Sequence, residues 1–457
     1  MTTITETLAA HVAATDCSRI PAPVAEATRR FVLDTLAVAW AGADAPGGKA
    51  IRDLVVADGG TPEAVLWAWG GHLPATAAAF VNGVSAASLD YDSVYEAGSV
   101  HADVVVVPAA WAVAERCGAS GAEFLAAVAL GTDIACRIGK AARKNSGWFY
   151  TSLAGVYGAA AACAKLLKLD QGGIADAMGL ALSHTAGTQQ ALLEKTVAKR
   201  LQSAFAARAG VFSAQLAGAG ASAPREALEG TYGYFRKYED CDPEVLLAQL
   251  GSVWENTRSA IKKYPSCTAN HPAVETAIAL AHEFDLRPDD VTEVEVTLSP
   301  FSQRLVGAPF EPAANPQVAA QFSIQYSLAS ALARRRLAIA DIQDKAVLDP
   351  ALAALARKVK IVVDENNKGK FAPAKIVVTS ARHGRVPRDA PFVPGTPDHP
   401  LGAADHRAKV LDCVSAGPRA LSAAQAELFI ARAASIEQVA DMRRFFDGIC
   451  NQQREAA

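Results

Sequence analysis

Four short segments of the chain gather the ionisable and aromatic side chains that could do chemistry. The sequence around them is rich in alanine and other small residues. Histidine and carboxylate side chains transfer protons, whereas lysine and arginine hold carboxylates or stabilise developing negative charge. The segments are Leu89-Asp-Tyr-Asp-Ser-Val-Tyr-Glu96 with the nearby His101, Ser146-Gly-Trp-Phe-Tyr-Thr-Ser152, Lys195 with Lys199 and Arg200, and Ile261-Lys-Lys-Tyr-Pro-Ser-Cys-Thr-Ala-Asn-His271.

In the first segment, Asp90 and Asp92 stand two residues apart and could bind a metal or orient a base. Aspartates in a loop also commonly cap helices, which is the simpler interpretation of this segment taken alone. The two are the only serious metal ligands in the sequence, because the nine histidines are dispersed and no recognisable ligand spacing occurs. We therefore predict a site without a metal.

The other three segments each allow two interpretations. Tyr150 and its aromatic neighbours form either a pocket wall or an aromatic plug in the core. Lys199 and Arg200 could hold carboxylates, or they could belong to a solvated basic face. Lys262 and His271 lie where the composition of the chain changes, and clefts between domains are favoured binding sites.

Composition and missing motifs exclude several classes of protein. With 44 Lys+Arg against 47 Asp+Glu, the net charge of −3 gives no electrostatic basis for binding nucleic acid. The uncharged stretch 145–164 contains glycine, serine and threonine and ends at Lys165, so we interpret it as a buried helix and predict no membrane contact. No P-loop, nucleophile elbow, zincin or EF-hand pattern occurs. Because the first residues lack the features of a signal peptide, we predict a cytoplasmic protein with reduced cysteines.

Two patterns of apolar residues along the chain indicate which secondary structure positions these segments. Up to about residue 260 the chain shows helical periodicity, as in 23–36, 121–138, 153–169 and 204–217, which predicts an all-α bundle. Beyond Pro265, the run 291–298 alternates with period two, β-branched runs follow at 359–364 and 375–379, and 322–337 has a helix pattern.

The pattern becomes helical again toward the C-terminus, in 403–413 and 422–446. The predicted fold is therefore mainly α. A large helical domain is built from both chain ends, residues 1–266 and 406–457, and a smaller α+β domain, residues 267–405, is inserted between them.

Taken in order, these segments resemble the MmgE/PrpD family, which includes 2-methylcitrate dehydratase, cis-aconitate decarboxylase and iminodisuccinate epimerase. The resemblance covers essentially the whole chain. It is carried by Phe31-Val-Leu-Asp-Thr-Leu-Ala-Val, Ala79-Phe-Val-Asn-Gly83, Leu89-Asp-Tyr-Asp92, Ala198-Lys-Arg-Leu201, Lys262-Lys-Tyr-Pro265 through His271, and Phe322-Ser-Ile-Gln-Tyr326.

The resemblance implies the same helical domain with an α+β insertion, a homodimer, small di- or tricarboxylate substrates and no cofactor. It also assigns roles to residues of this chain. Asp90, His101, Lys199, Lys262 and Tyr326 match active-site positions in the cleft, and His271 matches a nearby motif histidine.

The chain departs from the family pattern at several polar positions. Where many members read H-A-L-D-[FY]-D-D-T, it has Ala87-Ser-Leu-Asp-Tyr-Asp-Ser-Val94, and the common G-W-H is Gly147-Trp-Phe149. The histidine of K-x-L-H is Gln202, and the Pro-Gly after the active-site histidine is Ala102-Asp103. Several acids that could protonate a leaving hydroxyl are therefore absent.

An epimerase needs no such acid, because one proton leaves the carbon and another returns on the opposite face. The leading hypothesis is therefore a cofactor-independent epimerase or racemase of an imino- or amino-diacid such as iminodisuccinate. His101 and a lysine of burial-lowered pKa would transfer the protons, with Lys199, Lys262 and Asp90 as the other catalytic residues. We expect the substrate-binding residues to be Tyr326, Tyr150, Arg200 and His271.

Two alternatives remain. One is a hydro-lyase like 2-methylcitrate dehydratase, or a decarboxylase, acting on a tricarboxylate. The other is a non-catalytic protein that binds carboxylates, against which the joint presence of the four catalytic candidates argues.

Overall fold

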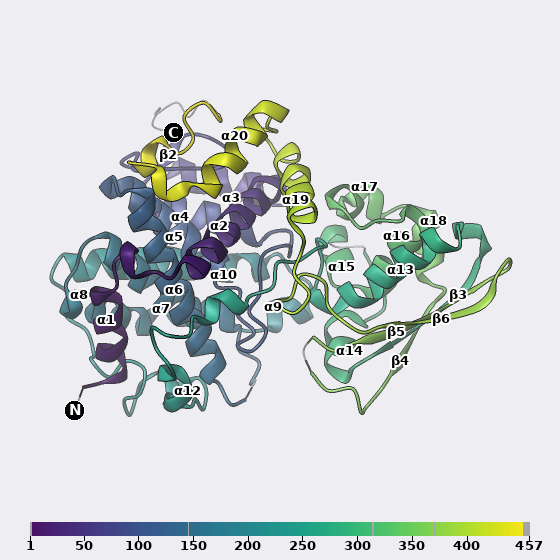
Figure 1. Ribbon diagram of the computed structural model, residues 1–457, viewed down its shortest axis with the longest axis horizontal. Coiled ribbons are helices and arrows are strands. Elements are labelled where there is room, and N and C mark those ends of the chain that lie inside the picture. The colour runs from purple at the N-terminus through teal and green to yellow at the C-terminus, as the bar shows by residue number, and fades with distance from the viewer. Residues whose placement is uncertain (1, 145, 313–314, 370, 451–457) are drawn as a thin grey trace.

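Helices dominate the structure, a computed structural model that describes residues 2–144, 146–312, 315–369 and 371–450. In Figure 1 the helices of the first part of the chain form one lobe with the yellow C-terminal helices, and the green segment forms a second lobe beside it. The helices of the first part are α1 (Ile4–Ala14), α2 (Ala22–Gly42), α3 (Gly48–Ala57), α4 (Ala75–Ala87), α5 (Asp103–Cys117), α6 (Gly121–Ala141), α7 (Tyr150–Leu166), α8 (Gln171–Ala181), α9 (Gln190–Leu193), α10 (Ala198–Gly218), α11 (Tyr234–Lys237) and α12 (Pro243–Leu247).

Local sequence signals begin these helices, and small residues allow them to pack closely. Ser120 and Glu123 form a reciprocal capping box at the start of α6, which satisfies backbone N–H groups that the helix cannot use internally. At the crossing of α6 and α7, a Cβ atom added to Gly131 would lie 2.6 Å from the carbonyl oxygen of Gly158. Glycine at this position therefore lets the two central helices approach to backbone contact.

The second lobe holds a four-stranded sheet in the order β4-β3-β5-β6. Strand β3 pairs in parallel with β4 and antiparallel with β5, which in turn pairs antiparallel with β6. The elements of this lobe are α13 (His271–Glu283), β3 (Val291–Leu298), α14 (Pro300–Val306), α15 (Pro316–Gln321), α16 (Ile324–Arg334), α17 (Asp344–Val347), α18 (Pro350–Ala356), β4 (Val359–Val363), β5 (Ala374–Ser380) and β6 (Gly384–Ala390).

Two strand pairs differ from the predicted pattern. Strand β6 was not predicted, because it is a largely exposed edge strand with charged residues and Pro387, features that protect sheet edges but hide the alternation of a strand. Within the helical part, β1 (Ala64–Val65) and β2 (His72–Leu73) form a small antiparallel pair, too short to leave a periodic signal.

The chain returns to the helical lobe with α19 (Ala403–Ser415) and α20 (Ala423–Ala434), which pack on α2 (Figure 1). A buried ionic group joins α19 to α2: Lys409 Nζ lies 2.8 Å from Asp34 Oδ1, and His406 Nε2 lies 3.1 Å from the same oxygen. Both chain ends therefore build the helical domain around an α+β insertion, which confirms the predicted fold class.

Other predictions about the molecule as a whole stay predictions. These are the domain boundaries at 266/267 and 405/406, the homodimer and the cytoplasmic location. Residues 451–457 of the predicted last segment lie outside the described residues. In the part of the chain that the structure describes, none of the helices has the length and apolar character needed to cross a membrane.

Short 3₁₀ turns join many of these elements, including η3 (Glu255–Arg258), η4 (Thr268–Asn270) and η6 (Ile339–Ile342).

Candidate active site

A cleft of about 860 Å³, its open mouth included, lies where the two lobes meet. Each of the four segments singled out in the sequence contributes to its lining, although they are far apart along the chain. The described residues that line it are Asp90, Val94, Glu96, Ser99, His101, Trp148, Phe149, Tyr150, Gln189, Leu192, Lys199, Lys262, Cys267, Thr268, Ala269, Phe301, Leu305, Phe322 and Phe371.

Asp90 is the centre of an ionic group on one side of the cleft. One of its carboxylate oxygens accepts a hydrogen bond from Lys199, in the first turn of α10, and the other lies 3.0 Å from Lys262 Nζ. Lys262 also donates to the Asp90 carbonyl oxygen over 2.8 Å. The Lys262 side chain is only 2% exposed, whereas that of Lys199 is 14% exposed and lines the cleft. Lys199 is therefore the more accessible cation.

Burial and charge compete in this group. Burial alone would raise the pKa of Asp90, but the charges of Lys199 and Lys262 outweigh it and hold that pKa well below its usual range. For Lys199, burial acts to lower the pKa, but the negative charges of Asp90 and Asp92 raise it above its ordinary value. Lys199 is thus a fixed cation at neutral pH, so it suits carboxylate binding and not the role of base that a burial-lowered pKa would have given it.

The backbone at Asp90 is itself unusual. Its φ of +49° lies in the left-handed region, which non-glycine residues adopt only when surrounding contacts hold them there. Those contacts come from distant segments: Lys262 binds the Asp90 carbonyl, the Tyr91 hydroxyl donates to the carbonyl of Lys263 over 2.9 Å, and Lys409 donates to the Tyr91 carbonyl over 2.9 Å. The turn that places Asp90 at the cleft is therefore held by hydrogen bonds to the segment 262–263 and to Lys409.

A second pair of side chains joins a histidine to a carboxylate, two residue types that transfer protons. His101 Nδ1 lies 2.6 Å from Asp92 Oδ2, and the His101 backbone N–H donates to Thr151 Oγ1 over 3.1 Å. Burial alone would raise the pKa of Asp92, but the charges of His101 and Lys262 hold it at about 2. An ionised Asp92 fixes the ring through Nδ1 and leaves Nε2 as the nitrogen for a substrate. The sequence left open whether Asp90 or another acceptor fixes His101, and the structure shows Asp92.

Two predicted substrate-binding residues do not reach the cleft. Arg200 follows Lys199 on α10, and because successive helical residues point about 100° apart, its buried guanidinium faces away and donates to the Pro46 carbonyl over 3.4 Å. Tyr326 is fully buried in the α+β lobe, where its hydroxyl donates to the carbonyl of Asp341. Neither side chain is among the described residues that line the cleft, and their roles in substrate binding stay predictions. A family motif identifies a position and not the face on which its side chain lies.

The other two predicted binding residues have partial roles. Tyr150 lines the cleft with its ring, but its hydroxyl donates to the carbonyl of Lys144. His271 is fully buried, and its Nε2 lies 3.2 Å from the Ser266 carbonyl. Burial and the charge of Lys262 lower the pKa of His271 to about 3, so the ring is neutral. His271 therefore packs behind the site and is not among the described residues that line the cleft.

Sequence reasoning missed the part of the apolar wall that the α+β lobe supplies. Phe301, Leu305, Phe322 and Phe371 enter it from the α+β lobe, and their sequence context is the same as that of ordinary core residues. The Phe322 ring centroid lies 5.7 Å from Lys199 Nζ, a cation–π distance. Their position in the cleft wall becomes visible only where the two lobes meet.

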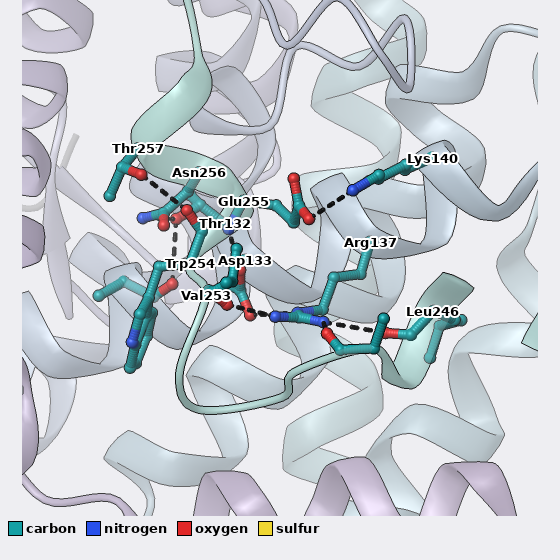
Figure 2. Close-up of polar contacts among 12 residues, drawn as sticks. Thr132, Asp133, Arg137, Lys140, Leu246, Val253, Trp254, Glu255, Asn256 and Thr257 are labelled. Carbon is teal, nitrogen blue, oxygen red and sulfur yellow. Dashed lines mark hydrogen bonds and ion pairs between the residues drawn. The ribbon is translucent and has the colours of Figure 1, made fainter. Parts of the chain in front are cut away.

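Another buried ionic group lies in the helical lobe and provides a contrast (Figure 2). Arg137 on α6 donates through Nε to Asp133 over 2.6 Å, and its terminal nitrogens donate to the carbonyls of Leu246, Ala248 and Val253. The second Asp133 oxygen accepts the backbone N–H of Glu255 over 2.6 Å. None of these residues is among those lining the cleft described above.

Metal binding has no visible basis in the described part of the chain, where no three His, Cys, Asp or Glu side chains are grouped so that they could hold an ion. Asp90 and Asp92, the pair considered from the sequence, bind lysines and a histidine instead.

Comparison with known proteins places the whole arrangement in context. Residues 6–244 match the MmgE/PrpD N-terminal domain, and residues 264–436 match the MmgE/PrpD C-terminal domain. A cis-aconitate decarboxylase of Aspergillus terreus (strain NIH 2624 / FGSC A1156) is 29% identical over 364 residues, which cover 74% of each chain. Cis-aconitate decarboxylases of Mus musculus and Homo sapiens are each 26% identical, over 80% of this chain and 77% and 78% of theirs.

Proposed function

The chain belongs to the MmgE/PrpD family, and from that premise we propose that it is a lyase that decarboxylates a small polycarboxylate without a cofactor. The observation that carries the proposal is the placement of one histidine–aspartate pair beside two fixed lysine cations in a single cleft. The relatives named above are decarboxylases and not epimerases, which supports the lyase alternative from the sequence better than the epimerase that led.

The proposed reaction uses each of these groups once. Lys199, assisted by Lys262, holds a carboxylate that the substrate retains. The bond to a neighbouring carboxylate breaks, carbon dioxide leaves, and the electron pair moves into the remaining conjugated carboxylate, where the lysines stabilise it. Protonated His101 then delivers the proton on Nε2 to carbon, and solvent restores that proton. Asp92 stabilises the imidazolium of His101 until the proton is transferred.

The number of proton-transfer groups distinguishes the candidate reactions. Decarboxylation requires one proton to be delivered, whereas epimerisation requires groups on two faces of a carbon, and dehydration requires both a base and an acid. Of the described residues lining the cleft, His101 is the one whose type ordinarily titrates near neutrality. Lys199 has a raised pKa, and burial raises the pKa of the Cys267 thiol to about 11. This count favours decarboxylation.

Incubation with unsaturated di- and tricarboxylates in deuterated water tests the proposal. We expect carbon dioxide release and one carbon-bound deuterium in each product molecule. Proton NMR measures the deuterium content of the product. Deuterium exchange next to a carboxylate without carbon dioxide would favour the epimerase and contradict the proposal. Loss or gain of water without carbon dioxide would favour the hydro-lyase and contradict it equally.

A further inference from the structure

Most of the wall of the cleft is apolar, and both lobes supply it. Trp148, Phe149 and Leu192 come from the helical lobe. Phe301, Leu305, Phe322 and Phe371 face them from the α+β lobe. An acid with only polar groups would leave this surface without a partner, so the wall indicates that part of the ligand is apolar.

Positive charge in the cleft is scarce. Among the described lining residues the permanent cations are Lys199 and Lys262, and no arginine is present. Both lysines are bound to Asp90, so the three side chains together carry one net positive charge. Glu96 also lines the cleft and accepts the backbone N–H of Phe371 over 3.0 Å, which adds negative charge at its rim.

The second ionisable pair adds no net positive charge to this balance. When His101 is protonated, its charge is matched by that of Asp92 at 2.6 Å. A compact tricarboxylate would bring three negative charges against the single net positive charge of the lysine group. Carboxylates placed against an apolar wall without partners are strongly unfavourable, because desolvation is not compensated.

We propose that the substrate is an amphipathic acid with at most two carboxylates and an alkyl or aryl arm in the place of a third carboxylate. A retained carboxylate lies at Lys199. The arm lies against Phe322, whose ring is 5.7 Å from that ammonium, and extends toward Phe149. The reaction on this substrate rests on the proposed function, but the binding preference follows from the cleft alone.

A series of substituted succinates tests the preference without turnover. Succinate bearing a carboxymethyl group is propane-1,2,3-tricarboxylate, and the matched compounds carry methyl, butyl or benzyl at the same carbon. By isothermal titration calorimetry we expect butyl- and benzylsuccinate to bind about tenfold or more tightly than the tricarboxylate, because the arm buries apolar surface. Equal or tighter binding of the tricarboxylate, or no binding by any member, overturns the proposal.

Failure of the reaction and failure of the preference are distinguishable in these measurements. If no acid releases carbon dioxide but the butyl and benzyl compounds still bind best, the lyase assignment fails and the substrate class stands. If carbon dioxide is released most efficiently from a tricarboxylate that also binds best, the lyase assignment stands and the substrate class fails.

Variants locate the arm. Phe149→Gln should weaken benzylsuccinate about fivefold or more and leave unsubstituted succinate nearly unchanged, since only the arm meets this ring. Phe212→Gln, a partly exposed phenylalanine on α10 that is not among the lining residues, is the matched control. Should Phe149→Gln not fold, Phe371→Gln on the opposite lobe makes the same comparison. Equal effects on both ligands, or none, would contradict this placement.

Discussion

The Arg137 group and the Asp90 group are built from similar parts and behave differently. Each buries an aspartate against basic side chains within the helical lobe. In the Arg137 group, every guanidinium nitrogen donates to Asp133 or to a backbone carbonyl, and Asp133 also accepts a backbone N–H (Figure 2). In the Asp90 group, Lys199 keeps an exposed fraction of 14% at the cleft. The first is closed and the second is open to a ligand.

The pKa values of the two aspartates are shifted in opposite directions. Burial raises the pKa of Asp133, and the single charge of Arg137 does not offset it. Burial acts in the same direction on Asp90, but two lysines reverse the result and lower its pKa. The planar arginine fork suits several fixed carbonyls, whereas the lysine ammonium is a compact charge that can turn to a new anion. A second cation that is partly exposed at the cleft thus distinguishes the binding group from the structural one.

The largest expected effect is on activity, at the His101–Asp92 pair beside the open group. His101→Asn should lower turnover by about 10²- to 10⁴-fold, the range for a lost acid–base group, while the protein stays folded, because asparagine can still donate a hydrogen bond to Asp92. Steady-state kinetics and thermal melting measure the two quantities. His184→Asn, an exposed histidine that is not among the lining residues, is the control. Turnover near the parent rate in His101→Asn would remove the histidine from the mechanism.

At the closed group the larger effect should be on stability. Arg137→Ala leaves Asp133 buried without its cation, so we expect the free energy of unfolding to fall by about 3–5 kcal/mol. Turnover per folded molecule should stay within about twofold, because none of the group is among the lining residues. Lys199→Met is the comparison, since Lys262 still pairs with Asp90 there. A greater loss of stability in Lys199→Met would break the contrast.

The His101–Asp92 pair should also show a defined pH dependence of stability. The pKa of Asp92 is held at about 2, below an unfolded value of about 4, so the unfolded chain binds more protons between these values. The contribution of Asp92 is therefore complete above about pH 4 and is lost as the pH falls toward 2, with a maximum of about 3 kcal/mol. Denaturant unfolding of the parent and of Asp92→Asn should differ most above pH 4 and converge below it. A difference that grows in acid would contradict the assignment.

The smallest effect tests a residue that lies outside the cleft. Tyr326→Phe removes one buried hydrogen bond to the Asp341 carbonyl and should cost about 1 kcal/mol of unfolding free energy. Substrate affinity and turnover should not change, which the same kinetic assay measures. An increase in KM of tenfold or more would restore Tyr326 as a substrate-binding residue.

Much of the fold was predictable because it depends on local patterns. Helices α6 and α7 are buried on nearly all sides, and their long runs of small and apolar residues without proline indicate buried helices, whereas the alternation of β3 reflects one buried face. The exposed edge strand β6 has no buried face to reveal it, and its pairing with β5 depends on a neighbour that spacing does not identify.

The candidate site was predictable in its ionisable members and, as one of two interpretations, in the aromatic segment around Tyr150. Asp90, His101 and Lys199 stood out because charged residues are rare among small apolar ones, and the structure brings them to one cleft. The direction of a side chain is not encoded in its type, so Arg200 beside Lys199 could not be separated from it. The aromatic wall, including Phe322, is defined by the meeting of two lobes, which no local pattern describes.

The contacts of Lys409 affect the order in which parts of the molecule fold. It holds the Tyr91 carbonyl beside Asp90 across 318 residues of sequence, and it binds Asp34 across 375. Contacts between such distant residues form late, because the intervening chain must first be closed into a loop and the α+β lobe lies within that loop. During refolding we therefore expect helix content to recover before enzymatic activity, as circular dichroism and activity sampled along the same time course would show. The protein would pass through a helical but inactive stage, in which the turn at Asp90 is not yet locked.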